Sequence, residues 1–294
     1  MHRLLLVLIV AWFALSPAAR AQDDKKDREP LPAPKINYEA LDKLGWKLGS
    51  QAYTWRSRNL LDTLDILKRL DLRYIELWPG QKFSSEGGTK VDSLSDAQIE
   101  QLQAKFKETN VTPMAYGVVD LPNDEAKARK IFDYVKKLGI KEIVSEPSPE
   151  ALPLVDKLAE EYDMKVAIHN HPAPSRYFDC ATVIEATKER SDRIGACADL
   201  GHWVRSGLSS PECLKKLEGK IISLHVKDID ERKFDVPWGT GTVDIAACLK
   251  ELKRQNIKPL FSVEYERGQG TELIANVAKS IQYFSDQATE LAKE

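Results

Sequence analysis

The sequence has few cysteines and no Cys-x-x-Cys pair. Its four cysteines, Cys180, Cys197, Cys213 and Cys248, are widely spaced. A domain of this size buries enough apolar surface to fold without disulfide bonds, even in an oxidising compartment. We therefore expect buried free thiols rather than a disulfide framework.

The chain also lacks an excess of positive charge. Its 43 lysines and arginines face 45 aspartates and glutamates, which gives a net charge of −2. Without residues 1–21, which hold Arg3 and Arg20 and no acidic residue, the balance is 41 against 45 and the net charge is −4. Binding to a nucleic-acid backbone requires a concentrated positive surface. The composition therefore argues against a nucleic acid as partner.

Only one long hydrophobic run is present, and it lies near the first residue. Arg3 precedes an apolar stretch from Leu4 to Leu15, and an Ala-x-Ala motif ends at Ala21. This three-part pattern is typical of a secretory signal peptide, and the run is too short to span a bilayer as a stable helix. We predict a signal peptide at residues 1–21, a secreted or periplasmic mature protein and no stable membrane insertion after cleavage. An uncleaved membrane anchor is the alternative.

Residues 22–43 are charged and then proline-rich, beginning QDDKKDREPLPAPKIN. Such a composition cannot bury a core, so we predict a disordered linker there. The remaining residues, 44–294, are long enough for one large α/β domain.

Short apolar runs alternate with longer helical patterns throughout residues 44–294. The gaps between successive runs, about 20 to 40 residues, are long enough for one crossover helix each. The eight runs that we predict to be strands are KLGSQAY from Lys47, YIELW from Tyr74, TPMAYG from Thr112, EIVSE from Glu142, KVAIHN from Lys165, GACAD from Gly195, IISLH from Ile221 and LFSVE from Leu260.

Several of the intervening helices carry start signals. Ser95 with Gln98 forms a capping box ahead of an apolar repeat. Ser148-Pro149 and Ser210-Pro211 each combine a cap residue with a proline suited to the first helical turn. Asp244 precedes another apolar repeat and is a further expected cap.

Eight strand–helix units in one domain predict a parallel (β/α)8 TIM barrel. A doubly wound open sheet is the alternative, and it would normally carry a glycine-rich phosphate-binding turn after its first strand. The segment after the first predicted strand, SQAYTWRSRN, has no glycine.

Five predicted strands in the second half of the chain end in a carboxylate or an imidazole. A barrel places its catalytic side chains at the carboxyl ends of strands, on the inward pleat face. In IISLH, His225 shares that face with Ser223 and Ile221. The corresponding ends of the other four strands are Glu146, His169 with His171, Asp199 and Glu264.

Acidic groups that converge at one barrel mouth require a positive partner. We predict that Glu146, Asp199, His225 and Glu264 bind one divalent metal ion. An oxygen-rich set with one imidazole suits Mn²⁺, Mg²⁺, Co²⁺ or Zn²⁺, and the sequence does not choose among them. A solvated charge at the end of a strand is the alternative for any one of the four.

These strand ends resemble those of the xylose isomerase-like TIM barrel superfamily. The similar segments are YIELWPGQ, CADLGHW, SLHVKDID and FSVEYE, and the most specific are Asp-x-x-His at 199–202 and His-x-Lys-Asp at 225–228. The superfamily includes sugar-phosphate isomerases and epimerases, ketose epimerases, inosose dehydratase and endonuclease IV. The resemblance extends from about residue 44 to the last residue and implies the same barrel.

The fifth predicted strand departs from the ketose epimerase pattern. In those enzymes the resemblance implies a metal held by Glu, Asp, His and Glu, with the first Glu at the end of the fifth strand. This chain has His169 there, and Glu146 ends the fourth strand instead. The histidine-rich segment VAIHNHP resembles inosose dehydratase more than the epimerases.

The resemblance implies removal of a proton next to a carbonyl or hydroxyl that a metal polarises. Glu264 and Glu146 are then both metal ligands and candidate bases. His202 is expected to contact a substrate oxygen or transfer a proton, and His169 and His171 to handle the second proton. Lys227 is expected to neutralise the enediolate, or to pair with Asp228 in solvent.

Aromatic side chains gather near the same strand ends and can stack on the apolar faces of sugars. The expected substrate contacts are Tyr53, Trp78, Trp203 and Trp238, with Glu76 of YIELW as a further site residue that faces the barrel mouth. Core packing is the alternative for any single ring, although Trp203 and Trp238 have the sequence context of loops.

The predicted export favours a neutral sugar or keto sugar as substrate, because sugar phosphates are cytoplasmic metabolites. We predict an exported metal-dependent sugar isomerase or epimerase. A lyase or dehydratase acting on a keto sugar or 3-keto-glycoside is the alternative enzyme, and a non-catalytic sugar-binding barrel is the third hypothesis. Endonuclease activity is disfavoured by the net charge and by the small number of histidines. The sequence leaves a homo-oligomer open.

Overall fold

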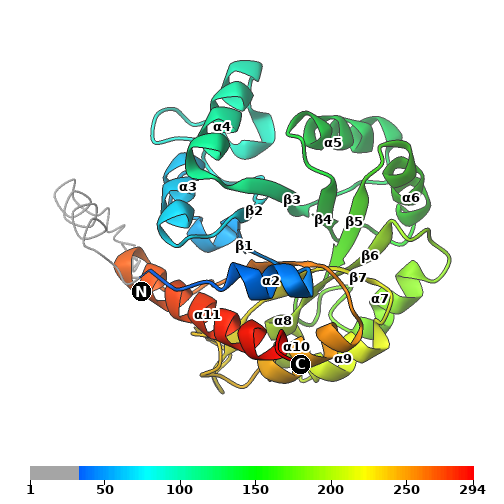
Figure 1. The fold of residues 1–294 in the computed structure, drawn as a ribbon. Coiled ribbons are helices and arrows are strands. Elements are labelled where there is room, and N and C mark those ends of the chain that lie inside the picture. Colours follow the sequence, from blue (N-terminus) through cyan, green and yellow to red (C-terminus); the bar gives the residue numbers. More distant parts are fainter. Residues whose placement is uncertain (1–32) are drawn as a thin grey trace, which may run out of the picture.

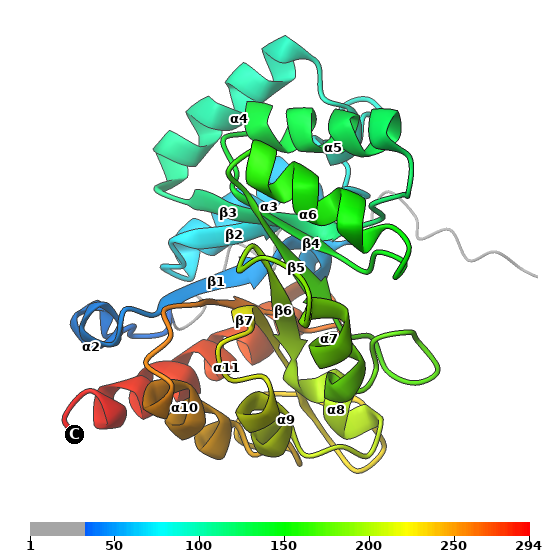
Figure 2. The same cartoon turned by 90° about the vertical axis from the view of Figure 1, so that its right-hand side faces the viewer.

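The computed structural model describes residues 33–294, so the predicted signal peptide and the first part of the predicted linker lie outside the described residues. Eight parallel strands close into a barrel in the order β1-β10-β7-β6-β5-β4-β3-β2, and helices surround it (Figure 1). In the side view, α3 to α6 cover one flank of the barrel and α8 to α11 the other (Figure 2). The predicted (β/α)8 barrel is confirmed.

Each of the eight predicted runs contains one barrel strand. These strands are β1 (Lys47–Gln51), β2 (Tyr74–Leu77), β3 (Thr112–Val119), β4 (Glu142–Ser145), β5 (Lys165–His169), β6 (Ile194–Asp199), β7 (Ile221–Val226) and β10 (Leu260–Val263).

Helices connect the strands, and two short 3₁₀ turns lie at Ala52–Trp55 and Val91–Ser93. The helices are α2 (Tyr38–Leu44), α3 (Leu60–Arg69), α4 (Asp96–Thr109), α5 (Glu125–Lys137), α6 (Leu152–Glu161), α7 (Cys180–Thr187), α8 (Leu200–Arg205), α9 (Ser210–Lys216), α10 (Ile245–Arg254) and α11 (Gly270–Leu291). None of the helices within residues 33–294 combines the length and apolar character needed to cross a membrane.

Two of the four expected helix starts are confirmed, and a third, Ser210, is the first residue of α9, whose cap is Ser209. The capping box of Ser95 and Gln98 is formed at α4, and Asp244 caps α10. The expected cap at Ser148-Pro149 is wrong, because residues 149–151 form a turn and α6 begins only at Leu152. A second proline, Pro153, occupies the first turn of that helix instead.

The end of the predicted linker is ordered in the structure. The side chain of Asn37 caps α2, and its backbone N–H donates to Ser285 Oγ of α11 at 2.8 Å. Leu41 is buried and belongs to the main hydrophobic core. The linker prediction extends too far here, because a single apolar turn gains stability from α11 that its own composition does not reveal.

Small side chains fill the lower barrel interior and leave room at its mouth. The inner cluster consists of Ala115, Val144, Ala167, Cys197 and Leu260. Close backbone approach requires glycine on the barrel wall at Gly49 and Gly117 among others, because a Cβ at Gly49 would lie 2.7 Å from the Tyr74 carbonyl oxygen and one at Gly117 would lie 2.4 Å from that of Val144. The outward-facing strand residues join the larger core beneath the helices.

The first residues of β7 do not follow the expected alternation. Pairing with β6 shifts between Ala196 and Cys197, so that Ala196 lies opposite Ile221 and Cys197 opposite Ser223. This irregularity turns Ile222 toward the inner cluster and Ile221 toward the outer core, the reverse of the prediction. Ser223 and His225 keep their expected face because they follow the shift.

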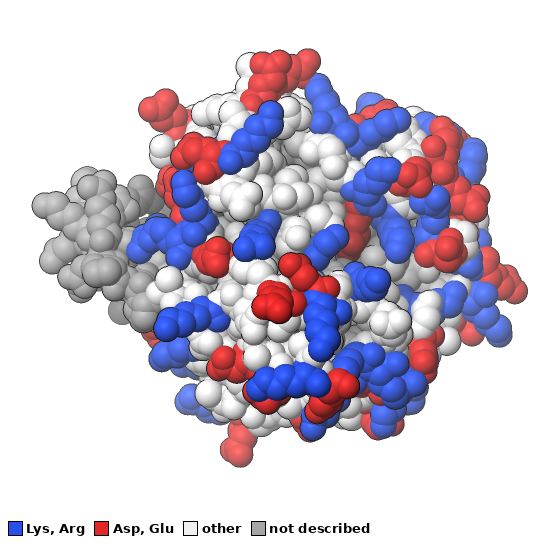
Figure 3. Space-filling view, viewed as in Figure 1, with Lys and Arg blue, Asp and Glu red and all other residues white. Residues whose placement is uncertain are grey.

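A hairpin absent from the prediction projects after β7. Its strands are β8 (Asp228–Ile229) and β9 (Asp235–Val236), each too short to give a periodic signal. The four cysteines are buried and free, as expected. Over the outer helices, basic and acidic side chains are interspersed on the face drawn in Figure 3.

Candidate active site

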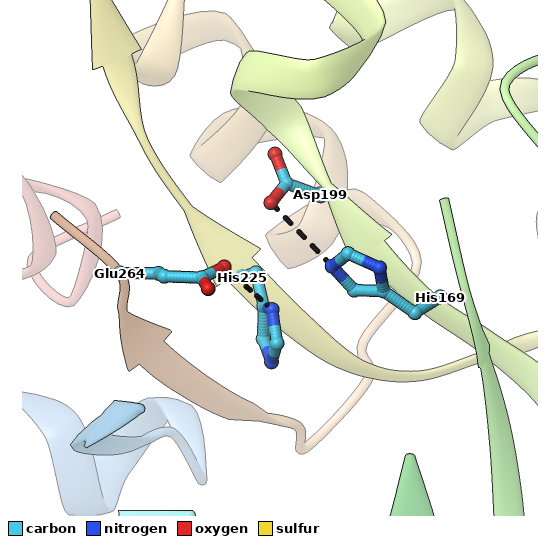
Figure 4. A group of neighbouring side chains, drawn as sticks. All are labelled: His169, Asp199, His225 and Glu264. Carbon is cyan, nitrogen blue, oxygen red and sulfur yellow. Dashed lines mark ion pairs between the residues drawn. The ribbon is translucent and has the colours of Figure 1, made fainter. Parts of the chain in front are cut away.

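Four side chains from four neighbouring strands meet at the mouth of the barrel (Figure 4). They are His169 at the end of β5, Asp199 at the end of β6, His225 on β7 and Glu264 just after β10. One nitrogen or oxygen from each lies within 4.8 Å of the others, and all four residues are buried. We call these four residues the donor group.

The donor group suits a divalent metal ion. Three of its atoms, His169 Nε2, Asp199 Oδ2 and His225 Nδ1, are buried and make no well-aligned hydrogen bond to a described residue. They lie in ion pairs instead, because His169 Nε2 is 3.6 Å and Lys227 Nζ 3.1 Å from Asp199 Oδ2, and His225 Nδ1 is 2.8 Å from Glu264 Oε2. A set of two imidazole nitrogens and two carboxylate oxygens matches the preferences of Zn²⁺, Mn²⁺ or Co²⁺.

Glu146, predicted as a ligand, lies beside the donor group and forms a second set of potential metal-binding residues with His169 and His171, whose ligand atoms also lie within 4.8 Å of one another. With both rings protonated at Nδ1, Glu146 Oε1 accepts from His169 at 3.3 Å and also from His171. Burial alone would raise the pKa of Glu146, but these two hydrogen bonds lower it to about 2. Glu146 is therefore a carboxylate that orients two imidazoles, leaving Nε2 of His169 toward Asp199 at 3.6 Å and Nε2 of His171 available.

Glu76 lies beneath His225 inside the barrel rather than on the cavity wall. Its Oε2 accepts from His225 Nε2 at 2.8 Å, and its Oε1 accepts from Gln51 Nε2 at 2.9 Å. Although burial disfavours the imidazolium, Cys197, Glu76 and Glu264 raise the pKa of His225 well above its usual range. Glu76 fixes the ring so that Nδ1 faces Glu264. A carboxylate that accepts a hydrogen bond from the other ring nitrogen orients a metal-binding histidine in the same way.

Lys227 is buried among acidic groups at the same mouth. Its Nζ lies 3.1 Å from Asp199 Oδ2, 2.7 Å from Glu264 Oε2 and 2.6 Å from Glu266 Oε1. Burial would raise the pKa of Glu264, but Lys227 and His225 hold it well below its usual range. The expected pair with Asp228 does not form, because Asp228 accepts backbone N–H groups of Ile229, Gly239, Gly241 and Val243.

His202 lies between two cations. Its Nδ1 is 3.0 Å from Arg205 Nη1 and its Nε2 is 3.3 Å from Lys227 Nζ. Burial lowers the pKa of His202 well below its usual range, and Lys227 lowers it further against the opposing effect of Asp199. The ring is therefore neutral and poorly placed to take up a proton.

A cavity of about 570 Å³ opens beside the donor group. Its polar wall includes His171, His202 and Glu264, and its apolar wall includes Tyr53 and Trp78, whose rings meet edge to face at 4.9 Å. A ring pair of this kind offers an apolar surface to the C–H face of a sugar. Tyr53 and Trp78 therefore lie where a substrate contact was expected.

Trp203 and Trp238 do not line the cavity, contrary to the expectation that they contact substrate. Trp203 lies in α8 with no exposed surface, and Trp238 is 2% exposed and packs against Phe284 of α11. Both belong to the main hydrophobic core. Their flanking sequences suggested loops, but the short α8 and the turn after β9 are folded against the barrel.

Five cavity residues were absent from the prediction, the apolar Val118 and Pro172 and the polar Gln51, Arg205 and Glu266. Gln51 is the last residue of β1, and its neutral side chain carried no signal of a metal or acid–base site. Glu266 follows Glu264 by two residues on the same side of the chain, a spacing that could have drawn attention to it. Arg205 lies one helical turn beyond His202, and its partner Asp235 comes from the unpredicted hairpin at 2.9 Å.

Comparison with known proteins places this site in a family. The sequence model of the xylose isomerase-like TIM barrel family matches residues 64–287. An inosose dehydratase from Clostridium perfringens is 28% identical over 145 residues, which cover 40% of this chain and 46% of the dehydratase, so the match spans less than half of that relative.

Solved structures agree on the fold. An uncharacterised protein from Parabacteroides distasonis is 33% identical with a TM-score of 0.67, and the match covers 82% of this chain and 99% of that one. The structure of IolI protein with a bound zinc atom has a TM-score of 0.65 at 22% identity, covering 83% of this chain and 98% of that one. The second likeness concerns the fold alone. On the family match and its closed barrel, this chain belongs to the xylose isomerase-like TIM barrel family.

Proposed function

We propose that this protein is a metal-dependent lyase that removes a proton next to the carbonyl of a neutral keto sugar and then expels a β-substituent. The observation that carries this proposal is His171, which lines the cavity beside the donor group and is paired through Nδ1 with Glu146. A carboxylate that accepts a hydrogen bond from Nδ1 orients the imidazole and leaves its Nε2 free to take and return a proton.

His171 is the best candidate for proton transfer among the described residues of the cavity wall. Glu264 is occupied by Lys227 and His225, Glu266 by Lys227, and His202 lies between two cations. Epimerisation requires acceptors of similar strength on both faces of the substrate, and a single acceptor does not provide them. One imidazole suffices for an elimination on one face.

In the proposed step, His171 takes the proton from the α-carbon, and the electrons of the C–H bond form a C=C bond as the β-carbon–oxygen bond breaks. The imidazolium then gives the same proton to the departing oxygen. A divalent metal ion held by His169, Asp199, His225 and Glu264 would polarise the carbonyl and stabilise the negative charge that develops on it. The family match to an inosose dehydratase supports an elimination.

The second candidate is an isomerase, the first prediction from the sequence. The same single acceptor favours it over an epimerase, because His171 could return the proton to the neighbouring carbon instead of to a leaving group. The substrate class is the same in both cases.

A neutral substrate is supported by the pairing of the cavity's cation. Arg205, the arginine on the described cavity wall, binds Asp235 at 2.9 Å and lies 3.9 Å from Glu266. Its guanidinium is therefore already neutralised and is poorly suited to hold a phosphate. We further propose, from the predicted signal peptide, that the enzyme acts outside the cytoplasm.

The test is incubation of metal-loaded protein with keto sugars and 3-keto-glycosides in D₂O, with mass detection of products. We expect release of water or of the aglycone, and a loss in kcat of about 100-fold or more for His171→Ala. Ser175→Ala is the matched control, because Ser175 Oγ donates only to the backbone carbonyl of His171 at 2.9 Å.

The other outcomes separate the hypotheses. Deuterium incorporated in an isomerised sugar, without elimination, would select the isomerase. Sugar binding without exchange or product across the whole panel would reject an enzyme and favour the sugar-binding barrel.

A further inference from the structure

Lys227 occupies a cation position of its own next to the donor group. Its ammonium has no exposed surface, and it lies within 3.1 Å of Asp199, Glu264 and Glu266. Three carboxylates and one ammonium in a buried space form an ionic cluster whose total charge governs which further ions can enter. The cluster joins the donor group to the cavity, because Glu264 belongs to both.

The ammonium contacts the same oxygens that face the other members of the donor group. Glu264 Oε2 lies 2.7 Å from Lys227 Nζ and 2.8 Å from His225 Nδ1. Asp199 Oδ2 lies 3.1 Å from Lys227 Nζ and 3.6 Å from His169 Nε2. A metal ion within the donor group would therefore share two oxygens with the ammonium, and the two cations would repel each other.

Of the three carboxylates in the cluster, Glu266 is the one that lies outside the donor group. Its Oε1 makes the shortest of the three contacts with Lys227, at 2.6 Å, and its side chain is 29% exposed on the cavity wall. The other two carboxylates are fully or nearly fully buried. Glu266 can therefore hold the ammonium on the cavity side when another cation approaches Asp199 and Glu264.

The net negative charge of the cluster can be neutralised by one divalent cation. The three carboxylates that contact Lys227 carry −3 and the ammonium carries +1, so −2 is left once a metal ion has displaced the proton of His225. That remainder equals the charge of one divalent ion with opposite sign. The cluster is thus neutral when both cations are present, and it carries −2 without the metal ion and −1 without the ammonium.

We propose that Lys227 and a divalent metal ion occupy this site together, sharing Asp199 and Glu264, and that Glu266 makes the sharing possible by drawing the ammonium toward the cavity. The inference rests on the metal dependence proposed above. Lys227 is then a positioning residue that sets the affinity for the metal. In the metal-loaded protein its ammonium faces the cavity, where it can contact a substrate oxygen that bears developing negative charge.

The test measures the affinity of the purified protein for Mn²⁺ and Zn²⁺ by calorimetry in four forms: wild type, Lys227→Met, Glu266→Gln and the control Glu272→Gln. Lys227→Met removes the competing cation, so we expect binding tighter by about tenfold or more. Glu266→Gln leaves the ammonium on Asp199 and Glu264, so we expect binding weaker by about tenfold although Glu266 is not a ligand. Glu272, an exposed acid in the first turn of α11, should have no effect.

Thermal melting shows whether a change in metal affinity is caused by misfolding of a variant. Without metal, Lys227→Met leaves three clustered carboxylates unbalanced, so we expect a lower Tm that metal restores by a larger shift than in wild type. If Lys227→Met fails to fold, weaker metal binding by Glu266→Gln together with unchanged binding by Glu272→Gln still decides the question.

Two results would overturn the inference. Unchanged or weaker metal binding by Lys227→Met would show that Lys227 supports the ligands rather than competing with the metal. Unchanged binding by Glu266→Gln would reject the role of Glu266, and in both cases a metal-dependent lyase would survive. Absence of metal binding by every form would reject the inference and the metal dependence together.

Discussion

Glu76 decides which nitrogen of His225 faces the donor group. Its Oε2 accepts from Nε2, so Nδ1 is left toward Glu264 at 2.8 Å. In Glu76→Gln, the amide that replaces one oxygen can donate to Nε2 and favour the opposite tautomer. Because a carboxylate behind a metal-binding histidine typically contributes 10- to 100-fold, we expect metal affinity to fall by about that factor.

Metal titration of Glu76→Gln against wild type checks this expectation. Ser262→Ala is the matched control, because Ser262 Oγ also donates to Glu76 Oε2, at 3.2 Å, but leaves the carboxylate that faces His225 Nε2 unchanged. Equal metal affinity in wild type and Glu76→Gln would contradict the orienting role of Glu76.

At this scale, the sequence could reveal which residue types end the strands but not which atoms meet. Alternation placed Asp199, His225 and Glu264 on the inward face, and the structure brings them together. The choice between Glu146 and His169 depended on side-chain reach across two strand ends, which alternation does not encode. Arg205 donates to Asp235 in a hairpin 30 residues further along the chain, and no local sequence pattern predicts such a contact.

At the scale of elements, Asp228 holds the segment after β7 in place. Its two oxygens accept four backbone N–H groups, Oδ1 from Ile229 and Val243 and Oδ2 from Gly239 and Gly241. In Asp228→Asn, one oxygen becomes an N–H₂ group that faces two donors, so two hydrogen bonds to a charged acceptor are lost. We expect destabilisation by about 2–3 kcal/mol and a Tm lower by about 5–10 °C.

Calorimetry of Asp228→Asn and of Asp244→Asn tests the argument. Asp244 caps α10 through Oδ1 alone, and asparagine caps as well as aspartate, so this control should melt like wild type. Similar melting of both variants would mean that the four N–H groups do not depend on the charge of Asp228.

The elements themselves were largely predictable, because a parallel strand buried on both faces gives a short apolar run and each crossover a longer periodic one. The errors lie where tertiary contacts outweigh local pattern. Tyr38–Leu44 becomes helical by packing on α11, and Ile222 turns inward because β7 is irregularly paired with β6. Pro149 begins a turn rather than a helix, since the chain must first leave the end of β4.

For the molecule as a whole, a buried carboxyl group inside the barrel links stability to pH. Glu142 opens β4 on the same pleat face as Val144 of the inner cluster, and its Oε1 is buried without a hydrogen-bond partner. Burial raises the pKa of Glu142 to about 7, with the nearby Ser223 hydroxyl opposing the shift and Glu76 adding to it. The folded barrel therefore favours the protonated form.

The direction of this pH dependence follows from the protonation of Glu142 in the folded and in the unfolded chain. Below the ordinary pKa of a glutamate, both the folded and the unfolded chain carry a protonated Glu142 and stability is unaffected. As the pH rises to about 7, the unfolded chain ionises freely while the folded barrel resists ionisation, so stability is progressively lost.

Glu142→Gln removes this loss and should stabilise the protein above pH 7 by about 2–3 kcal/mol, a range that allows for partial exposure of the residue. Urea unfolding at acidic and at mildly alkaline pH measures the difference, with exposed Glu231→Gln as the control. An equal free-energy change for Glu142→Gln at both pH values would show that the carboxyl group inside the barrel is not what links stability to pH.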